Sequence, residues 1–143
     1  MFKRLLTAIR VALFAWAETQ PMPKGEVPVH DLTSLSELDA CLVESEQRPV
    51  FIFKHSTACP ISSEAYRQVA AYVAAAAPGD PPVYLVKVIE DRPVSNQIAD
   101  VLGVVHKSPQ IILVSSRATA WSASHYGVRA EKMKENAIPR PSA

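Results

Sequence analysis

The sequence has only two cysteines, Cys41 and Cys59, among its 143 residues. Two thiols are too few for a disulfide framework or a cysteine-rich zinc site, and no pair among the four histidines has the spacing of metal ligands, so no metal cofactor is expected. Charge of one sign is not in excess, because 15 basic and 14 acidic residues leave a net charge of +1. This balance gives no electrostatic basis for binding nucleic acid. A reducing cytoplasm is the expected location.

A long hydrophobic run is also missing from the N-terminal region, because the apolar stretch at residues 11–17 is far shorter than a membrane span. Residues 1–20 instead predict an amphipathic helix, whose apolar face could pack on the rest of the protein, on a partner or on a membrane surface. A signal peptide is the alternative, since Lys3 and Arg4 resemble a charged n-region and residues 15–17 fit a cleavage site. The apolar stripe of the helix consists of Phe2, Leu5, Leu6, Ile9, Leu13 and Trp16.

The chain is long enough for one folded domain with a short appendage. Prolines at positions 21, 23 and 28, together with Gly25, indicate a linker rather than a helix or strand. We therefore expect an N-terminal helix and proline-rich linker (1–26), a folded domain (27–138) and a frayed C-terminal tail (139–143).

Within the domain, runs of β-branched and apolar residues alternate with segments of helical periodicity. The alternating first part implies parallel strands with crossover helices, and the last two strands form a hairpin. This order predicts an α/β domain with a thioredoxin-like fold, in which helices flank a central mixed sheet of four to five strands. Strands are expected at about 27–32, 50–53, 83–89, 111–114 and 119–123, and helices at about 34–46, 60–77, 91–102 and 128–137.

Two of these helices have apolar residues at helical spacing. Thr33 or Ser34 can cap the first helix, with Glu37 completing a capping box. Its apolar stripe is Leu35, Leu38, Cys41 and Leu42, which places Cys41 on a core face. The second helix carries the stripe Ile61, Ala65, Val69 and Val73.

The chemistry is expected at Cys59, which follows a buried strand and directly precedes Pro60. Pro60 suits the first position of a helix, and the amides of the first turn then favour the thiolate of Cys59. Ser62 stands where a C-x-x-C redox motif has its second cysteine. Its hydroxyl can donate a hydrogen bond to the sulfur but cannot resolve a mixed disulfide, so the site is predicted to be monothiol. A buried structural cysteine is the alternative.

A second loop is expected to face this thiol in the predicted fold. Pro109 lies just ahead of a strand and is the candidate for a cis peptide, which would expose the backbone of Ser108 to a thiol substrate. His106 and His125 are expected at the rim of the site, whereas His30 is not.

Further residues around the two loops have both functional and structural interpretations. His55, which precedes Ser56 and Thr57 in the active-site loop, could hold the thiolate, shuttle a proton or order the loop. Arg92, Ser95 and Asn96 could hydrogen-bond a sugar or carboxylate of a thiol cofactor, and helix capping by Ser95 or Asn96 is the alternative. Trp121 and Tyr126 are expected to serve core and edge packing.

The strings FKHSTACPIS, EDRPVSNQIADVLGV, HKSPQIILV and WSASH occur in this order. Together they resemble the YtxJ-type monothiol bacilliredoxins, which are thioredoxin-fold proteins of the bacillithiol system. The resemblance covers about residues 27–135. It implies that Cys59 is the nucleophile that removes bacillithiol from protein mixed disulfides. It also implies bacillithiol as low-molecular-weight thiol co-substrate, bacillithiolated client proteins as partners and a cytoplasmic role under oxidative stress.

Two other functions stay open at this point. The motif C-P-x-S also resembles the C-G-F-S motif of monothiol glutaredoxins, which can hold an iron–sulfur cluster, although Pro60 and Ile61 replace the Gly-Phe pair. A redox-inert adaptor that docks through the N-terminal helix is the third reading.

Overall fold

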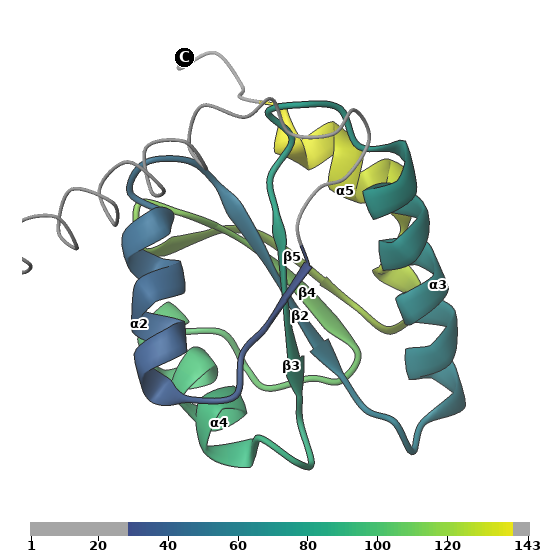
Figure 1. The fold of residues 1–143 in the computed structure, drawn as a ribbon. Coiled ribbons are helices and arrows are strands. Elements are labelled where there is room, and N and C mark those ends of the chain that lie inside the picture. Colours follow the sequence, from purple (N-terminus) through teal and green to yellow (C-terminus); the bar gives the residue numbers. More distant parts are fainter. Residues whose placement is uncertain (1–28, 139–143) are drawn as a thin grey trace, which may run out of the picture.

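The computed structural model describes residues 29–138, and the predicted N-terminal helix and linker (1–26) and C-terminal tail (139–143) lie outside this range. Figure 1 shows the arrangement of the elements. The strands are β1 (Val29–Asp31), β2 (Val50–His55), β3 (Val83–Lys87), β4 (Gln110–Ser115) and β5 (Ala118–Ser124). The helices are α2 (Leu35–Glu44), α3 (Pro60–Ala75), α4 (Arg92–Leu102), the short 3-10 helix η1 (His125–Gly127) and α5 (Ala130–Ala137).

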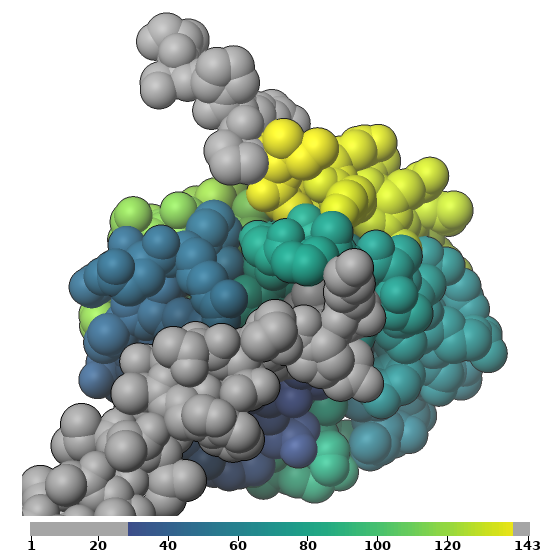
Figure 2. Space-filling view, turned by 45° about the horizontal axis from the view of Figure 1, so that its top comes forward, coloured from purple at the N-terminus to yellow at the C-terminus, as the bar shows by residue number. Residues whose placement is uncertain are grey.

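The five strands form one mixed sheet in the order β1-β3-β2-β4-β5. β1, β3 and β2 are parallel, whereas β4 is antiparallel to both β2 and β5. Helices α2 and α4 cover one face of the sheet, and α3 and α5 cover the other (Figure 1). In the space-filling view, α5 (yellow) lies against α3 (teal), away from α2 (blue) (Figure 2). The thioredoxin-like fold predicted from the sequence is therefore confirmed.

The central strand β2 supplies both halves of the core, because successive side chains of a strand point to opposite faces. Val50 and Ile52 pack with α2 and α4, whereas Phe51 and Phe53 pack with α3. A strand buried on both faces is expected in a sheet covered by two helical layers. The next residue, Lys54, continues the α2/α4 face and is also fully buried.

Helix α2 begins as the capping pattern predicts. Ser34 is the N-cap and accepts a hydrogen bond from the Glu37 backbone N–H at 3.2 Å. The Glu37 carboxylate in turn accepts a hydrogen bond from the backbone N–H of Thr33 at 2.7 Å. This is the second bond of a capping box, except that its donor is the residue before the N-cap rather than the N-cap itself. Cys41 is fully buried as expected, but Leu35 is 53% exposed and is not part of the core stripe.

The buried face of α3 differs from the predicted stripe. Ser62, Ala65, Val69 and Tyr72 are buried, whereas Ile61 and Val73 are only partly buried. Residues three or four positions apart can lie on the same face of a helix, so the sequence alone fits more than one buried stripe. Packing against Phe51 and Phe53 buries the stripe of α3 that contains Tyr72. The ring of Tyr72 meets that of Phe51 edge to face at 5.3 Å, and its hydroxyl donates to the carbonyl of Pro81.

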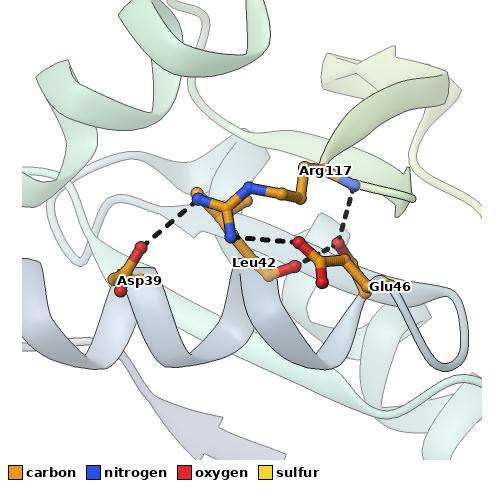
Figure 3. A network of polar contacts seen from close by, with 5 residues as sticks. Asp39, Leu42, Glu46 and Arg117 are labelled. Atoms are coloured by element: carbon orange, nitrogen blue, oxygen red, sulfur yellow. Dashed lines mark hydrogen bonds and ion pairs between the residues drawn. The ribbon is translucent and has the colours of Figure 1, made fainter.

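The β4–β5 hairpin has a tight two-residue turn rather than the predicted four-residue one. Its central residues, Ser116 and Arg117, have φ of 50° and 62°, a backbone conformation that residues other than glycine seldom adopt. Contacts to α2 and to the two residues that follow it offset the cost of this conformation (Figure 3): the Arg117 N–H donates to Ser45 Oγ at 2.9 Å, and its guanidinium reaches the carboxylates of Glu46 and Asp39.

The other boundaries agree with the predicted ones to within about three residues. The last helix begins at Ala130 rather than Val128, because η1 occupies the preceding turn. Trp121 packs on the α3/α5 side as expected, but Tyr126 is 73% exposed and does not serve edge packing. Within residues 29–138, no helix is both long and apolar enough to cross a membrane.

Candidate functional site

Cys59 is the N-cap residue of α3, with extended backbone angles and Pro60 at the start of the helix. Its carbonyl accepts the backbone N–H groups of Ser62 and Ser63 at 3.1 and 3.3 Å, so the first turn is closed directly onto the cysteine. The residue is partly exposed. The structure thus places an accessible thiol at the N-terminus of a 16-residue helix, as the sequence predicts.

Ser62 is fully buried and faces the active-site loop rather than the thiol. Its hydroxyl oxygen accepts the Ser56 backbone N–H at 2.9 Å and lies 2.8 Å from His55 Nδ1. The predicted hydrogen bond from Ser62 to the sulfur of Cys59 is not among the contacts of the described residues. Ser62 therefore holds the loop between β2 and α3 in place.

His55 ends β2 and is positioned by Ser62 and by aromatic neighbours. Its ring lies 5.2 Å from that of Tyr66 and 5.6 Å from that of Phe53. Burial, with a smaller effect of the Lys87 charge, lowers the pKa of His55 below its usual value, against an opposing effect of Glu90. The imidazole is therefore neutral at pH 7, with Nδ1 directed to Ser62.

The rest of the active-site loop is held from two sides. Ser56 is buried, whereas Thr57 is exposed and its hydroxyl donates to the Glu90 carboxylate at 3.2 Å. Glu90 precedes α4, so this hydrogen bond joins the loop before α3 to the loop before α4.

The second loop reaches the same edge of the sheet. The Ser108–Pro109 peptide, the candidate for a cis bond, is cis. Gln110 pairs with Lys54 in the β2–β4 register, so this loop begins beside the end of the strand that leads to Cys59. The Pro109 carbonyl accepts the backbone N–H of His125 at 2.9 Å, which brings His125 to the rim. Ser108 is partly buried, and its hydroxyl has no hydrogen-bond partner in the described structure.

Lys54 is a site residue that sequence reasoning missed. It is fully buried in β2, and burial lowers the pKa of its ammonium group to about 8. Nζ lies 3.0 Å from Nδ1 of His106, an exposed residue of the loop before β4. The available signal was a lysine that directly continues the apolar run at 50–53, because a lysine is rarely buried unless it is paired.

The comparison with protein families identifies the chain. Residues 30–133 match the model described as monothiol bacilliredoxin BrxC. The chain belongs to the monothiol bacilliredoxin family. Together with the fold, this membership supports a thiol redox function and an interaction with a low-molecular-weight thiol.

Solved structures agree with the family on the fold. A candidate oxidoreductase with a thioredoxin fold is 27% identical, with a TM-score of 0.67 over 76% of this chain and 92% of that one. Thioredoxin from Fasciola hepatica is 14% identical, with a TM-score of 0.61 over 76% and 95% of the two chains. Thioredoxin from Trypanosoma brucei brucei is 13% identical, with a TM-score of 0.63 over 82% and 94%. The last two show similarity of fold only.

In this member of the bacilliredoxin family, the predicted residues of α4 lie at the same edge as Cys59. Asp91 is the N-cap of the helix, so the alternative of capping by Ser95 or Asn96 is wrong. Arg92 and Asn96 are exposed, whereas Ser95 is 1% exposed and its hydroxyl has no partner in the described structure.

Cys41 and His30 lie away from the site, as the sequence predicts. Cys41 is buried between α2 and the sheet, and burial, with a contribution from Glu44, raises the pKa of its thiol to about 12. His30 lies on the edge strand β1, where its ring stacks on Tyr84 at 4.9 Å. Within residues 29–138, Cys59 is therefore the one accessible thiol that the structure places at the sheet edge.

Proposed function

We propose that this protein is a monothiol thiol-disulfide oxidoreductase that removes bacillithiol from protein mixed disulfides, with Cys59 as the nucleophile. The observation that carries the proposal is the partly exposed Cys59 thiol at the N-terminus of α3, with a serine three residues later. Its clients are bacillithiolated proteins in a reducing cytoplasm, and bacillithiol is the thiol co-substrate.

The reaction is an exchange in which electrons balance without an added oxidant. The Cys59 thiolate attacks the bacillithiol sulfur of the mixed disulfide, a new S–S bond forms, and the old one breaks. The client's sulfur leaves as a thiolate and takes up a proton. Cys59 then carries the bacillithiol until a second thiol attacks that adduct.

The loops around Cys59 have distinct roles in this proposal. The backbone of Ser108, ahead of cis Pro109, pairs with the extended thiol substrate as it approaches Cys59. His55, neutral and held by Ser62, keeps the loop ordered with Ser56 and Thr57. Pro60 sets the start of the helix whose amides stabilise the thiolate.

Resolution of the adduct must come from another molecule. Ser62 carries no thiol, and its oxygen is already engaged by Ser56 and His55. Cys41 is fully buried with a raised pKa, so it supplies almost no thiolate at neutral pH. The site is therefore monothiol in mechanism as well as in sequence.

Intact-mass measurement after exposure to bacillithiol disulfide tests the proposal. We expect one adduct, located on Cys59, and its loss in Cys59→Ser. The variant Cys41→Ser is the matched control, and it should form the adduct and support turnover like the wild type. No adduct on the wild type would refute the function, and loss of turnover in Cys41→Ser would refute the monothiol mechanism.

A further inference from the structure

Lys54 is a buried cation without a counter-ion in the part of the chain that the structure describes. Its side chain is 0% exposed, and its one hydrogen bond is to His106 Nδ1 at 3.0 Å. Burial alone lowers its pKa, with no contribution from a carboxylate. An uncompensated charge in the interior is costly, so its presence at the edge of the active site needs an explanation.

The contact with His106 fixes where the imidazole proton lies. A lysine ammonium group has three donors and no acceptor, so the Nδ1 that it meets must accept. The ring proton of the neutral His106 is then on Nε2. Because His106 is exposed, this N–H is a donor available to a ligand at the surface.

Arg92 adds a second positive group at this position. Burial lowers the pKa of His106, and the positive charges of Lys54 and Arg92 lower it further. Arg92 follows the end of β3, which is parallel to β2, and the His106 loop leads into β4, which is antiparallel to β2, so both residues lie at the same edge of the sheet. Arg92 is exposed at the start of α4, and none of the ion pairs formed within residues 29–138 engages its guanidinium. Both surface donors thus lie at the edge of the sheet where Lys54 is buried.

The elements that meet at this edge of the sheet carry three buried polar atoms without a partner in the described structure. Lys54 and Gln110 are cross-strand partners and share a face of the sheet, on which Ile52 packs with Val94 and Ile98 of α4. Ser95, in the first turn of α4, and Ser108 each have a hydroxyl without a partner in the described structure, as does Gln110 Oε1. The two hydroxyls are donors that lack an acceptor, and a bridging water could connect the spare N–H groups of Lys54 to Gln110 Oε1.

We propose that Arg92 and His106, above the buried charge of Lys54, form a binding site for a carboxylate of the low-molecular-weight thiol that Cys59 receives. The inference rests on the proposed function, because it assigns the recognition of that thiol. Lys54 is a positioning residue: it orients His106 and supplies a fixed positive charge, while Arg92 and the His106 Nε2–H contact the carboxylate. The unpartnered hydroxyls of Ser95 and Ser108 make this edge of the sheet rich in donors.

Three small symmetric disulfides that differ in charge test this site: 3,3′-dithiodipropionate, bis(2-hydroxyethyl) disulfide and cystamine. Each reacts with the Cys59 thiolate to give a mixed disulfide and to release one thiolate, and intact mass gives the rate of the adduct. The quantity compared is the rate with the carboxylate probe divided by the rate with the neutral probe, which cancels changes in the intrinsic reactivity of Cys59.

Lys54→Met should lower this ratio roughly tenfold, the effect expected of a poorly screened unit charge at about 10 Å from the ligand. Arg92→Gln should also lower the ratio of the carboxylate-probe rate to the neutral-probe rate. Because Arg92 is exposed, this substitution leaves the packing of the core unchanged. Lys107→Met is the matched control, since it removes the same charge from an exposed position in the loop of His106, where solvent screening leaves the ratio nearly unchanged. The ratio of cystamine to the neutral probe should rise in Lys54→Met.

Equal ratios in wild type, Lys54→Met and Arg92→Gln would overturn the site while leaving Cys59 as the nucleophile. An equal fall in Lys107→Met would also overturn it, because the preference would then come from the general charge of the rim. Failure of the wild type to form an adduct with any of the probes would instead contradict the proposed function. If Lys54→Met does not fold, the result with Arg92→Gln alone decides.

Discussion

Replacing Lys54 with methionine should make the folded protein more stable. The two side chains have similar length and volume, so methionine can occupy the same space with little repacking. The substitution removes a charge that the described structure buries with only a histidine as partner. Replacing buried charged groups with apolar side chains of similar size is often neutral or stabilising.

The depressed pKa gives the size of this effect. A fall from 10.5 to about 8 corresponds to about 3 kcal/mol that disfavours the folded state at pH 7. Relaxation and water entry reduce such penalties, so we expect Lys54→Met to raise the free energy of unfolding by about 1–3 kcal/mol. For a domain of this size, the melting temperature should rise by roughly 3–5 °C per kcal/mol.

The effect should also depend on pH in a specific direction. Between a folded pKa of about 8 and an unfolded value of 10.5, the unfolded wild type binds more protons than the folded protein. The penalty is therefore complete below pH 8 and is lost as pH rises towards 10.5, so the stability of the wild type increases across this window. The advantage of Lys54→Met should shrink by about half between pH 7 and pH 9.5.

Urea unfolding at pH 7.0, 8.5 and 9.5 measures both the gain and its pH dependence. Lys107→Met is the control, because this exposed lysine should change the free energy of unfolding by less than about 0.5 kcal/mol at each pH. A Lys54→Met protein that is less stable than the wild type, or a difference that does not change with pH, would refute the claim that Lys54 is an uncompensated buried charge. A gain in stability accompanied by lost carboxylate preference would be a trade-off between stability and function.

Three further predictions concern Ser62 and Cys41. Ser62→Ala should lower the free energy of unfolding by about 1–3 kcal/mol, because the Ser56 N–H loses its acceptor inside the protein, whereas the exposed Ser63→Ala should change it little in the same urea titration. Ser62→Cys should create the C-x-x-C spacing of a dithiol site, so that intact mass after exposure to a small disulfide shows loss of two hydrogens rather than a stable adduct. Persistence of the adduct would show that a side chain at position 62 stays directed to Ser56 and His55 and does not reach Cys59. Iodoacetamide at pH 8 should alkylate one thiol in the folded protein and two in urea, because a pKa of about 12 leaves Cys41 with a thiolate fraction of about 10⁻⁴; rapid double labelling of the folded protein would show that Cys41 is accessible.

Much of the fold and the central part of the site could be predicted from the sequence, because the signals are local. Pro60 after Cys59 places the thiol at the start of α3, and Ser34 with Glu37 places the start of α2. The same holds for the order of strands and helices, which follows from periodicity and from the prolines that interrupt it. The distinctive strings around Cys59 and Pro109 indicated the family.

The rest was decided by contacts between residues far apart in the chain. Lys54 and His106 are 52 positions apart, and only the pairing of β2 with β4 brings their nitrogens together. From the sequence, the Ser62 hydroxyl could donate a hydrogen bond to the sulfur of Cys59, but the fold of the loop directs its oxygen to Ser56 and His55 instead. Sequence periodicity indicates which residues can share a face of a helix or strand. Which polar atoms become buried, and which partners they find there, depends on the packing of the whole domain, and that packing turned a lysine in an apolar strand into a candidate determinant of specificity.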